Sequence, residues 1–138
     1  MKRFVLPILL FIASISLLTG CTGSLPDSDS GTGWITYEVR EGLSYNDAWM
    51  IVVDALLTRG YQFETLSKDD GYMKTEYYHE TVESQGVETK TRLSVKFTYG
   101  RRTVRLKVDE EYIVGYKQPG VDIPRVADLK VELRDRLL

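Results

Sequence analysis

The chain has 138 residues, of which 28% are charged and 43% hydrophobic, with a formal net charge of −2 at pH 7. This length and composition are typical of a single small domain. The mild acidity argues against nucleic acid as a partner, because nucleic-acid-binding domains present a basic surface. With one cysteine and one histidine, the sequence offers no disulfide and no zinc site of familiar spacing, and it predicts no cofactor and no metal.

Residues 1–20 have the features of a secretory leader. Lys2 and Arg3 form a short positive region, and residues 4–18 follow without a charged side chain. This run is the length of a signal-peptide apolar region and too short for a comfortable spanning helix, which needs about 20 apolar residues. We therefore expect residues 1–20 to be a signal peptide; a plain membrane anchor is the alternative.

The leader ends in Leu18-Thr19-Gly20-Cys21, with a small residue directly before the only cysteine. This segment resembles the lipobox of bacterial lipoproteins. The resemblance implies signal-peptidase recognition of Leu18, Thr19 and Gly20, cleavage before Cys21, and lipid attachment at Cys21, where two or more acyl chains give stable membrane anchoring. Thr22 differs from the aspartate that signals inner-membrane retention, so the expected location is the outer membrane, with the domain facing the periplasm.

Residues 21–33 are expected to be the lipidated cysteine and a flexible linker, because they are small and polar and bury almost nothing. A single α+β domain is then expected over residues 34–138. Its first strand is predicted at residues 34–40, which are rich in β-branched and aromatic side chains.

A helix is predicted to begin after Ser44, which has Asp47 in a capping-box relation, and to end at Gly60. The segment between them is apolar around most of its circumference, which predicts that it lies in the core. Docking of a partner protein on part of its width is the alternative.

The rest of the pattern predicts an antiparallel meander followed by a helix that begins at Pro124. The expected strands cover residues 61–66, 72–81, 87–99 and 103–114. In the last two strands apolar and polar residues alternate, so one face of the sheet should be buried and the other wet. The predicted order is β-α-β-β-β-β-α, an antiparallel twisted sheet with two helices on one face.

Part of this domain resembles the helix-grip domains of BamC-type lipoproteins, accessories of the machine that inserts β-barrels into the outer membrane. The matching residues, in chain order, are Tyr45, Ala48, Trp49, Ala55, Leu56, Arg59, Gly60, Tyr61, Asp69, Gly71, Tyr72, Lys74, Thr75, Glu76 and Tyr77. The resemblance implies a helix-grip fold and a role in envelope assembly. BamC-type proteins usually carry two such domains, whereas one is expected here.

The sequence predicts no catalytic residues. His79 is expected on a strand facing solvent, because no nucleophile-elbow motif accompanies it. A carboxylate-based hydrolase would require two acidic residues to converge in a cleft. The candidates for such a pair are Asp69, Asp70, Asp109, Glu110 and Glu111.

The function predicted is a non-enzymatic lipoprotein, attached to the membrane through Cys21, that binds another envelope protein. The candidate surface is the open sheet face around Lys74, Glu76, Lys96, Arg105 and Lys107, or the hairpin tip at residues 82–87. Tyrosines would add to such a surface; Tyr72 and Tyr78 are expected on one side of their strand and Tyr77 on the other. A small-ligand module with a cavity between sheet and helix is the alternative.

Overall fold

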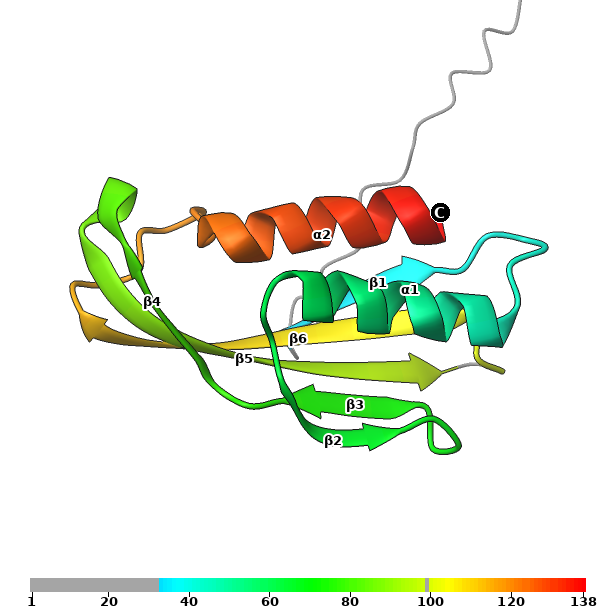
Figure 1. Cartoon of the computed structure of the whole chain (residues 1–138). Coiled ribbons are helices and arrows are strands. Elements are labelled where there is room, and N and C mark those ends of the chain that lie inside the picture. Colours follow the sequence, from blue (N-terminus) through cyan, green and yellow to red (C-terminus); the bar gives the residue numbers. More distant parts are fainter. Residues whose placement is uncertain (1–32, 99) are drawn as a thin grey trace, which may run out of the picture.

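The structure, a computed structural model, describes residues 33–98 and 100–138. The leader, Cys21 and the linker up to residue 32 lie outside the described residues. Two helices lie against one face of a six-stranded antiparallel sheet (Figure 1). The elements are β1 (Trp34–Glu38), α1 (Tyr45–Thr58), β2 (Phe63–Ser67), β3 (Tyr72–Thr75), β4 (Tyr78–Val82), a 3₁₀ turn η1 (Glu83–Gln85), β5 (Val87–Thr98), β6 (Thr103–Val114) and α2 (Pro124–Leu137). The predicted fold class is confirmed.

The strands lie in the order β1-β6-β5-β3-β2. β3 and β4 pair with different parts of β5: β3 with its C-terminal half and β4 with its N-terminal half. The single strand expected over residues 72–81 is thus divided into β3 and β4 by Glu76 and Tyr77. The division changes which tyrosines share a face. Tyr72 lies opposite Lys96 on the open side, whereas the Tyr78 ring packs against Tyr61 of the core at a centroid distance of 5.5 Å.

Helix α1 begins and ends where the sequence predicts. The Ser44 hydroxyl oxygen accepts a hydrogen bond from the Asp47 backbone N–H at 3.1 Å, and the hydroxyl donates to the Asp47 carboxylate at 2.6 Å. Gly60 has a φ of +82°, and this left-handed conformation lets the chain leave the helix towards β2. The buried face of α1 is made by Ala48, Trp49, Val52, Ala55 and Leu56, so most of the helix belongs to the core as expected.

The core fills the space between the two helices and the sheet. Among the described residues, the largest fully buried side chains are Tyr37, Tyr61, Leu56, Met73, Leu93, Leu106, Ile123, Leu129, Leu133, Leu137, Val52 and Val95. A smaller cluster, in which Val82 and Val87 pack against Ile123 and Val126, closes the end of the domain where β4 meets β5.

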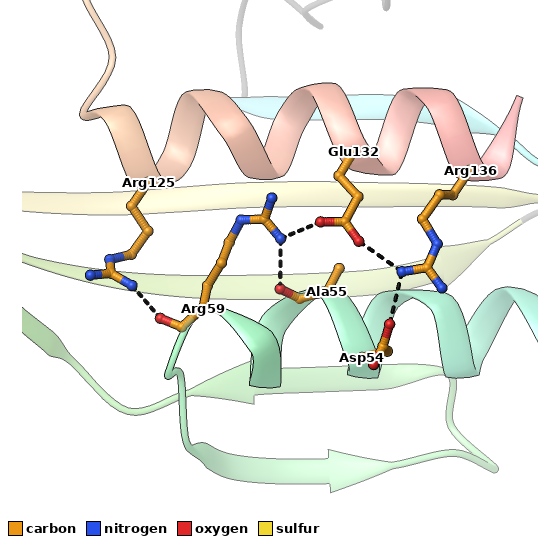
Figure 2. Close-up of polar contacts among 6 residues, drawn as sticks. All are labelled: Asp54, Ala55, Arg59, Arg125, Glu132 and Arg136. Atoms are coloured by element: carbon orange, nitrogen blue, oxygen red, sulfur yellow. Dashed lines mark hydrogen bonds and ion pairs between the residues drawn. The ribbon is translucent and has the colours of Figure 1, made fainter.

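An ionic network joins α1 to α2 along the outer surface of the helical layer (Figure 2). Arg59, which caps α1, and Arg136 of α2 both pair with Glu132, the latter at 2.7 Å. Arg136 also pairs with Asp54 of α1 at 2.8 Å. Arg125, at the start of α2, donates to the backbone carbonyl of Arg59. The network therefore fixes α2 alongside α1 with groups that are only partly buried.

Glu132 gives this network a pH dependence. Hydrogen bonds from Arg136 and Arg59 lower the pKa of the Glu132 carboxyl. A carboxyl whose pKa is lower when folded stabilises the native state above its unfolded pKa, and this contribution is lost as pH falls through the folded pKa. We expect Glu132→Gln to reduce the free energy of unfolding by about 1 kcal/mol at pH 7, because the group is partly exposed. Urea unfolding at several pH values measures the difference.

The matched control is Asp128→Asn, which removes an exposed carboxylate from the same helix. The gap between wild type and Glu132→Gln should shrink as the solution is acidified below the usual range of a glutamate pKa. A gap that stays constant from neutral to acidic pH would contradict an ionic contribution from Glu132.

Candidate interaction surface

The sheet face opposite the helices is the open face, and alternation along the strands decides which side chains it carries. On β5, Leu93, Val95 and Phe97 are buried under the helices. Arg92 and Lys96 point the other way, because neighbouring residues of a strand project to opposite faces. The buried and wet faces predicted for the last two strands are thus observed.

Four of the five residues predicted for the interaction surface lie on this face. Lys74 is opposite Ser94, which is in turn opposite Lys107. Lys96 is opposite Arg105. The antiparallel register therefore brings cations from three adjacent strands, β3, β5 and β6, onto one surface.

Glu76, the fifth predicted residue, is not part of this row. It lies in the break between β3 and β4, where its backbone N–H donates to the Gln62 carbonyl at 2.8 Å. There it lines a hollow of about 240 Å³ at the edge of the sheet, together with Gln62, Tyr77 and His79. His79 is exposed, as expected from the sequence.

Ion pairs between residues that the structure describes accompany several cations of the open face. The pairs are Lys74–Glu64 at 3.1 Å, Lys90–Glu111 at 2.8 Å, Arg92–Asp109 at 3.6 Å and Lys107–Asp109 at 3.3 Å. Lys96 is exposed and has no ion pair within the described part of the chain. Exposed pairs of this kind contribute about 0–1 kcal/mol, so their cations can exchange partners at little cost.

Aromatic rings lie beneath several of these cations. The Arg105 guanidinium lies 5.4 Å from the centre of the Trp34 ring. Lys90 and Arg92 lie 5.0 and 4.6 Å from the centre of the Tyr77 ring, which is 39% exposed. Aromatic and arginine side chains are enriched in protein interfaces.

Sequence reasoning missed Trp34 and Arg92 as members of this face. The signal for Trp34 was its alternation with Ile35 and Tyr37 in the first strand, since Tyr37 is in the core and Ile35 packs against it. No local signal assigns Tyr77, because its position depends on the interruption between β3 and β4.

The hairpin tip, the second predicted surface, has a structural role. Val82 and Val87 are 7% and 5% exposed and pack against α2 and the segment before it. Only the polar residues of the tip, such as Glu83 and Ser84, reach solvent. Its apolar side chains are therefore buried within the domain and are not exposed to a partner.

The five carboxylates considered for hydrolysis are spread over the domain. Asp109 and Glu111 are ion-paired on the open face. Glu110 points to the opposite face, where Lys117 donates to it at 2.7 Å; this hydrogen bond raises the pKa of Lys117. Asp69 and Asp70 lie in the turn between β2 and β3. The described residues also hold no group of three or more His, Cys, Asp or Glu side chains suited to a metal ion.

The side chains between helices and sheet are fully buried, and protein cores generally pack with few voids large enough for a ligand. A hollow of about 400 Å³ lies at the end of the sheet and is lined by Glu38, Val39, Arg40, Glu41, Arg102, Thr103 and Leu138. Most of these residues are exposed and polar, unlike the apolar walls of a typical small-molecule site.

The described residues form a small α+β domain with one cation-rich sheet surface that neither of its two helices covers. No protein-family model and no curated protein matches the chain. Among solved structures, it is similar to the adenylate sensor from AMP-activated protein kinase, crystallised with ZMP. The TM-score is 0.41 at 15% identity, covering 74% of this chain and 92% of that chain. A likeness of this degree carries no argument about function.

None of the helices within residues 33–98 and 100–138 is long and apolar enough to cross a membrane.

Proposed function

We propose that this chain is a bacterial lipoprotein, anchored through Cys21, whose domain binds another envelope protein without catalysing a reaction. The observation that carries the proposal is the placement of both helices on one side of the sheet. The other side is left with Lys74, Lys96, Arg105 and Lys107 in one patch.

The chemistry of the open face suggests the character of the partner. Cations spaced along adjacent strands attract a surface that carries carboxylates, and such complementarity fixes register and speeds encounter. Trp34 and Tyr77 supply the flat contact area that interfaces favour. We therefore propose an acidic surface of an envelope protein, in the outer membrane or the periplasm, as the partner.

A small ligand is the weaker candidate. It would need an apolar cavity beneath α2, and Leu129, Leu133 and Leu137 of that helix are each 0% exposed within the packed core. A protein partner needs no cavity, because it binds to a surface.

We expect two charge reversals on the open face, Lys96→Glu and Lys107→Glu together, to weaken partner binding about tenfold, equivalent to about 1.4 kcal/mol. The measurement is the yield of a photo-cross-linked adduct in cells, with the cross-linker placed at Thr36 of the open face. The same cross-linker at Asp128 of α2 reports on the opposite side of the domain.

The control for net charge is Lys68→Glu with Arg134→Glu, which alters two cations away from the open face by the same amount. It should leave the Thr36 adduct unchanged. Equal adduct yields from the two double variants, or the same adduct from Thr36 and Asp128, would rule out the open face as the binding surface.

A further inference from the structure

The sheet extends further than the helical layer that covers it. β2 is the outermost strand on its side of the sheet. Leu66 of β2 lies opposite Met73 of β3, and opposed residues in an antiparallel pair project to the same face. Met73 is 0% exposed because it lies in the core, yet Leu66 is 51% exposed. The helical layer therefore ends at α1 and leaves β2 open on the helix side at Leu66, whereas Phe63, at the start of the strand, packs against the core.

The flank of α1 that borders this open surface is also apolar. Met50 and Leu57 are 53% and 54% exposed, with the half-buried Val53 between them. Spacings of three and four residues place the three on one stripe of the helix. The stripe continues to Asn46, which accepts a hydrogen bond from Lys68 in the turn after β2.

The contacts of α1 show which way the stripe points. Asp54, on the other flank, pairs with Arg136 of α2. The Asn46–Lys68 hydrogen bond joins the stripe's own flank to the β2–β3 hairpin. The side of α1 and the helix-side surface of β2 thus form one apolar corner. It is lined by Met50, Val53, Leu57 and Leu66. We call it the vacant helix position.

The shape of the vacant helix position favours a helix over a strand as its occupant. β2 has five residues and a register shift between Phe63 and Thr65, and short, bulged edges resist the addition of another strand. A stripe at helical spacing beside an exposed sheet surface matches the way α1 itself packs. An amphipathic helix with apolar side chains at i, i+3 or i+4, and i+7 would contact both walls.

Neither the linker nor a second copy is a suitable occupant. Residues 21–33 contain only one large aliphatic side chain, Leu25, and cannot supply an apolar stripe. Residues 4–18 are apolar but are removed by the proposed cleavage before Cys21, so the inference rests on that part of the proposed function. Three half-exposed side chains and the half-buried Val53 make up the vacant helix position, whereas a stable interface uses about 20 to 30 residues on each partner. A patch of this size suits a short helix from another protein in a weak or transient complex.

We propose that an amphipathic helix of a partner protein binds beside α1, above β2, as the third helix of the layer. This site is on the opposite side of the sheet from the open face. Evidence against partner binding at the open face would therefore not count against this site.

The test uses the lipidated mature protein in nanodiscs, labelled at the methyl groups of Met, Leu and Val for NMR. The probe is a synthetic peptide of about 14 residues, long enough to form a helix, made of Leu, Ala, Glu and Lys with its leucines on one face. Submillimolar peptide should shift the methyl signals of Met50, Leu57 and Leu66. A peptide of the same composition with its leucines dispersed around the helix should not shift them.

Val131 on α2 is the internal control, since it is 47% exposed but far from the proposed site. Met50→Lys and Leu66→Lys should abolish the peptide-induced shifts, and Val131→Lys should leave them intact. All three variants should unfold near the wild-type temperature, because surface substitutions usually change stability by about 0.5 kcal/mol or less.

Four results would overturn the proposal. They are unchanged methyl signals at millimolar peptide, equal shifts at Val131, a dimer that buries Met50 and Leu66 without peptide, and a large loss of thermal stability in Met50→Lys. The last would show that another part of this chain already covers the stripe.

Discussion

Replacement of Cys21 by alanine is expected to abolish lipid attachment and leave residues 1–20 uncleaved. The thiol is the only group in the sequence able to form a thioether, since the chain has one cysteine. The proposed anchor would be lost with the thioether, because stable lipid anchoring takes two or more acyl chains. Incorporation of labelled palmitate and the intact mass of the purified protein measure both effects, which should be complete rather than graded.

Two substitutions at the neighbouring residue sharpen this experiment. Thr22→Ala should retain lipid and cleavage and remain in the outer membrane. Thr22→Asp should retain lipid but shift the protein to the inner membrane, as judged by separating the membranes on a density gradient. Palmitate labelling of Cys21→Ala equal to that of wild type would disprove the lipoprotein assignment.

Leu133→Ala should have the largest effect on stability. Leu133 is 0% exposed on the buried face of α2, between Leu129 and Leu137. Truncation removes buried methyl groups and leaves a cavity, which costs about 2–5 kcal/mol. Since a domain of this size is stable by about 5–15 kcal/mol in total, the midpoint of urea unfolding should fall markedly.

Val131→Ala is the matched control, because it also truncates an apolar side chain of α2 to alanine, but at an exposed position. Its effect should stay within about 0.5 kcal/mol. Similar losses for the two variants would mean that α2 does not pack against the sheet through the Leu129–Leu133–Leu137 face.

Much of the fold was accessible from sequence because its signals are local. The Ser44 cap, the glycine after α1 and the alternation of β5 each depend on residues a few positions apart. Such signals predicted the two helices, most strand boundaries and the separation of the sheet into a buried and a wet face. They also placed Lys74, Lys96, Arg105 and Lys107 on one side, since the side-chain period of a strand is two.

The pairing of strands was decided only in three dimensions. The order β1-β6-β5-β3-β2 puts the first strand next to the last, and no local pattern encodes that contact. The interruption at Glu76 and Tyr77 lets β3 and β4 pair with different parts of β5. This interruption turns Tyr78 towards the core, where it packs half-buried against Tyr61, and removes Glu76 from the predicted surface.

The sequence by itself determined the periodicities, the helix caps and the lipobox-like leader, because each of these features depends only on residues that are close together in the chain. The tertiary structure alone decided that Trp34 lies under Arg105, that Glu132 lies between two arginines, and that α1 leaves β2 uncovered. These features join segments far apart in the chain. They arise when the apolar faces of sheet and helices are buried together, and that packing sets which polar side chains then meet at the surface.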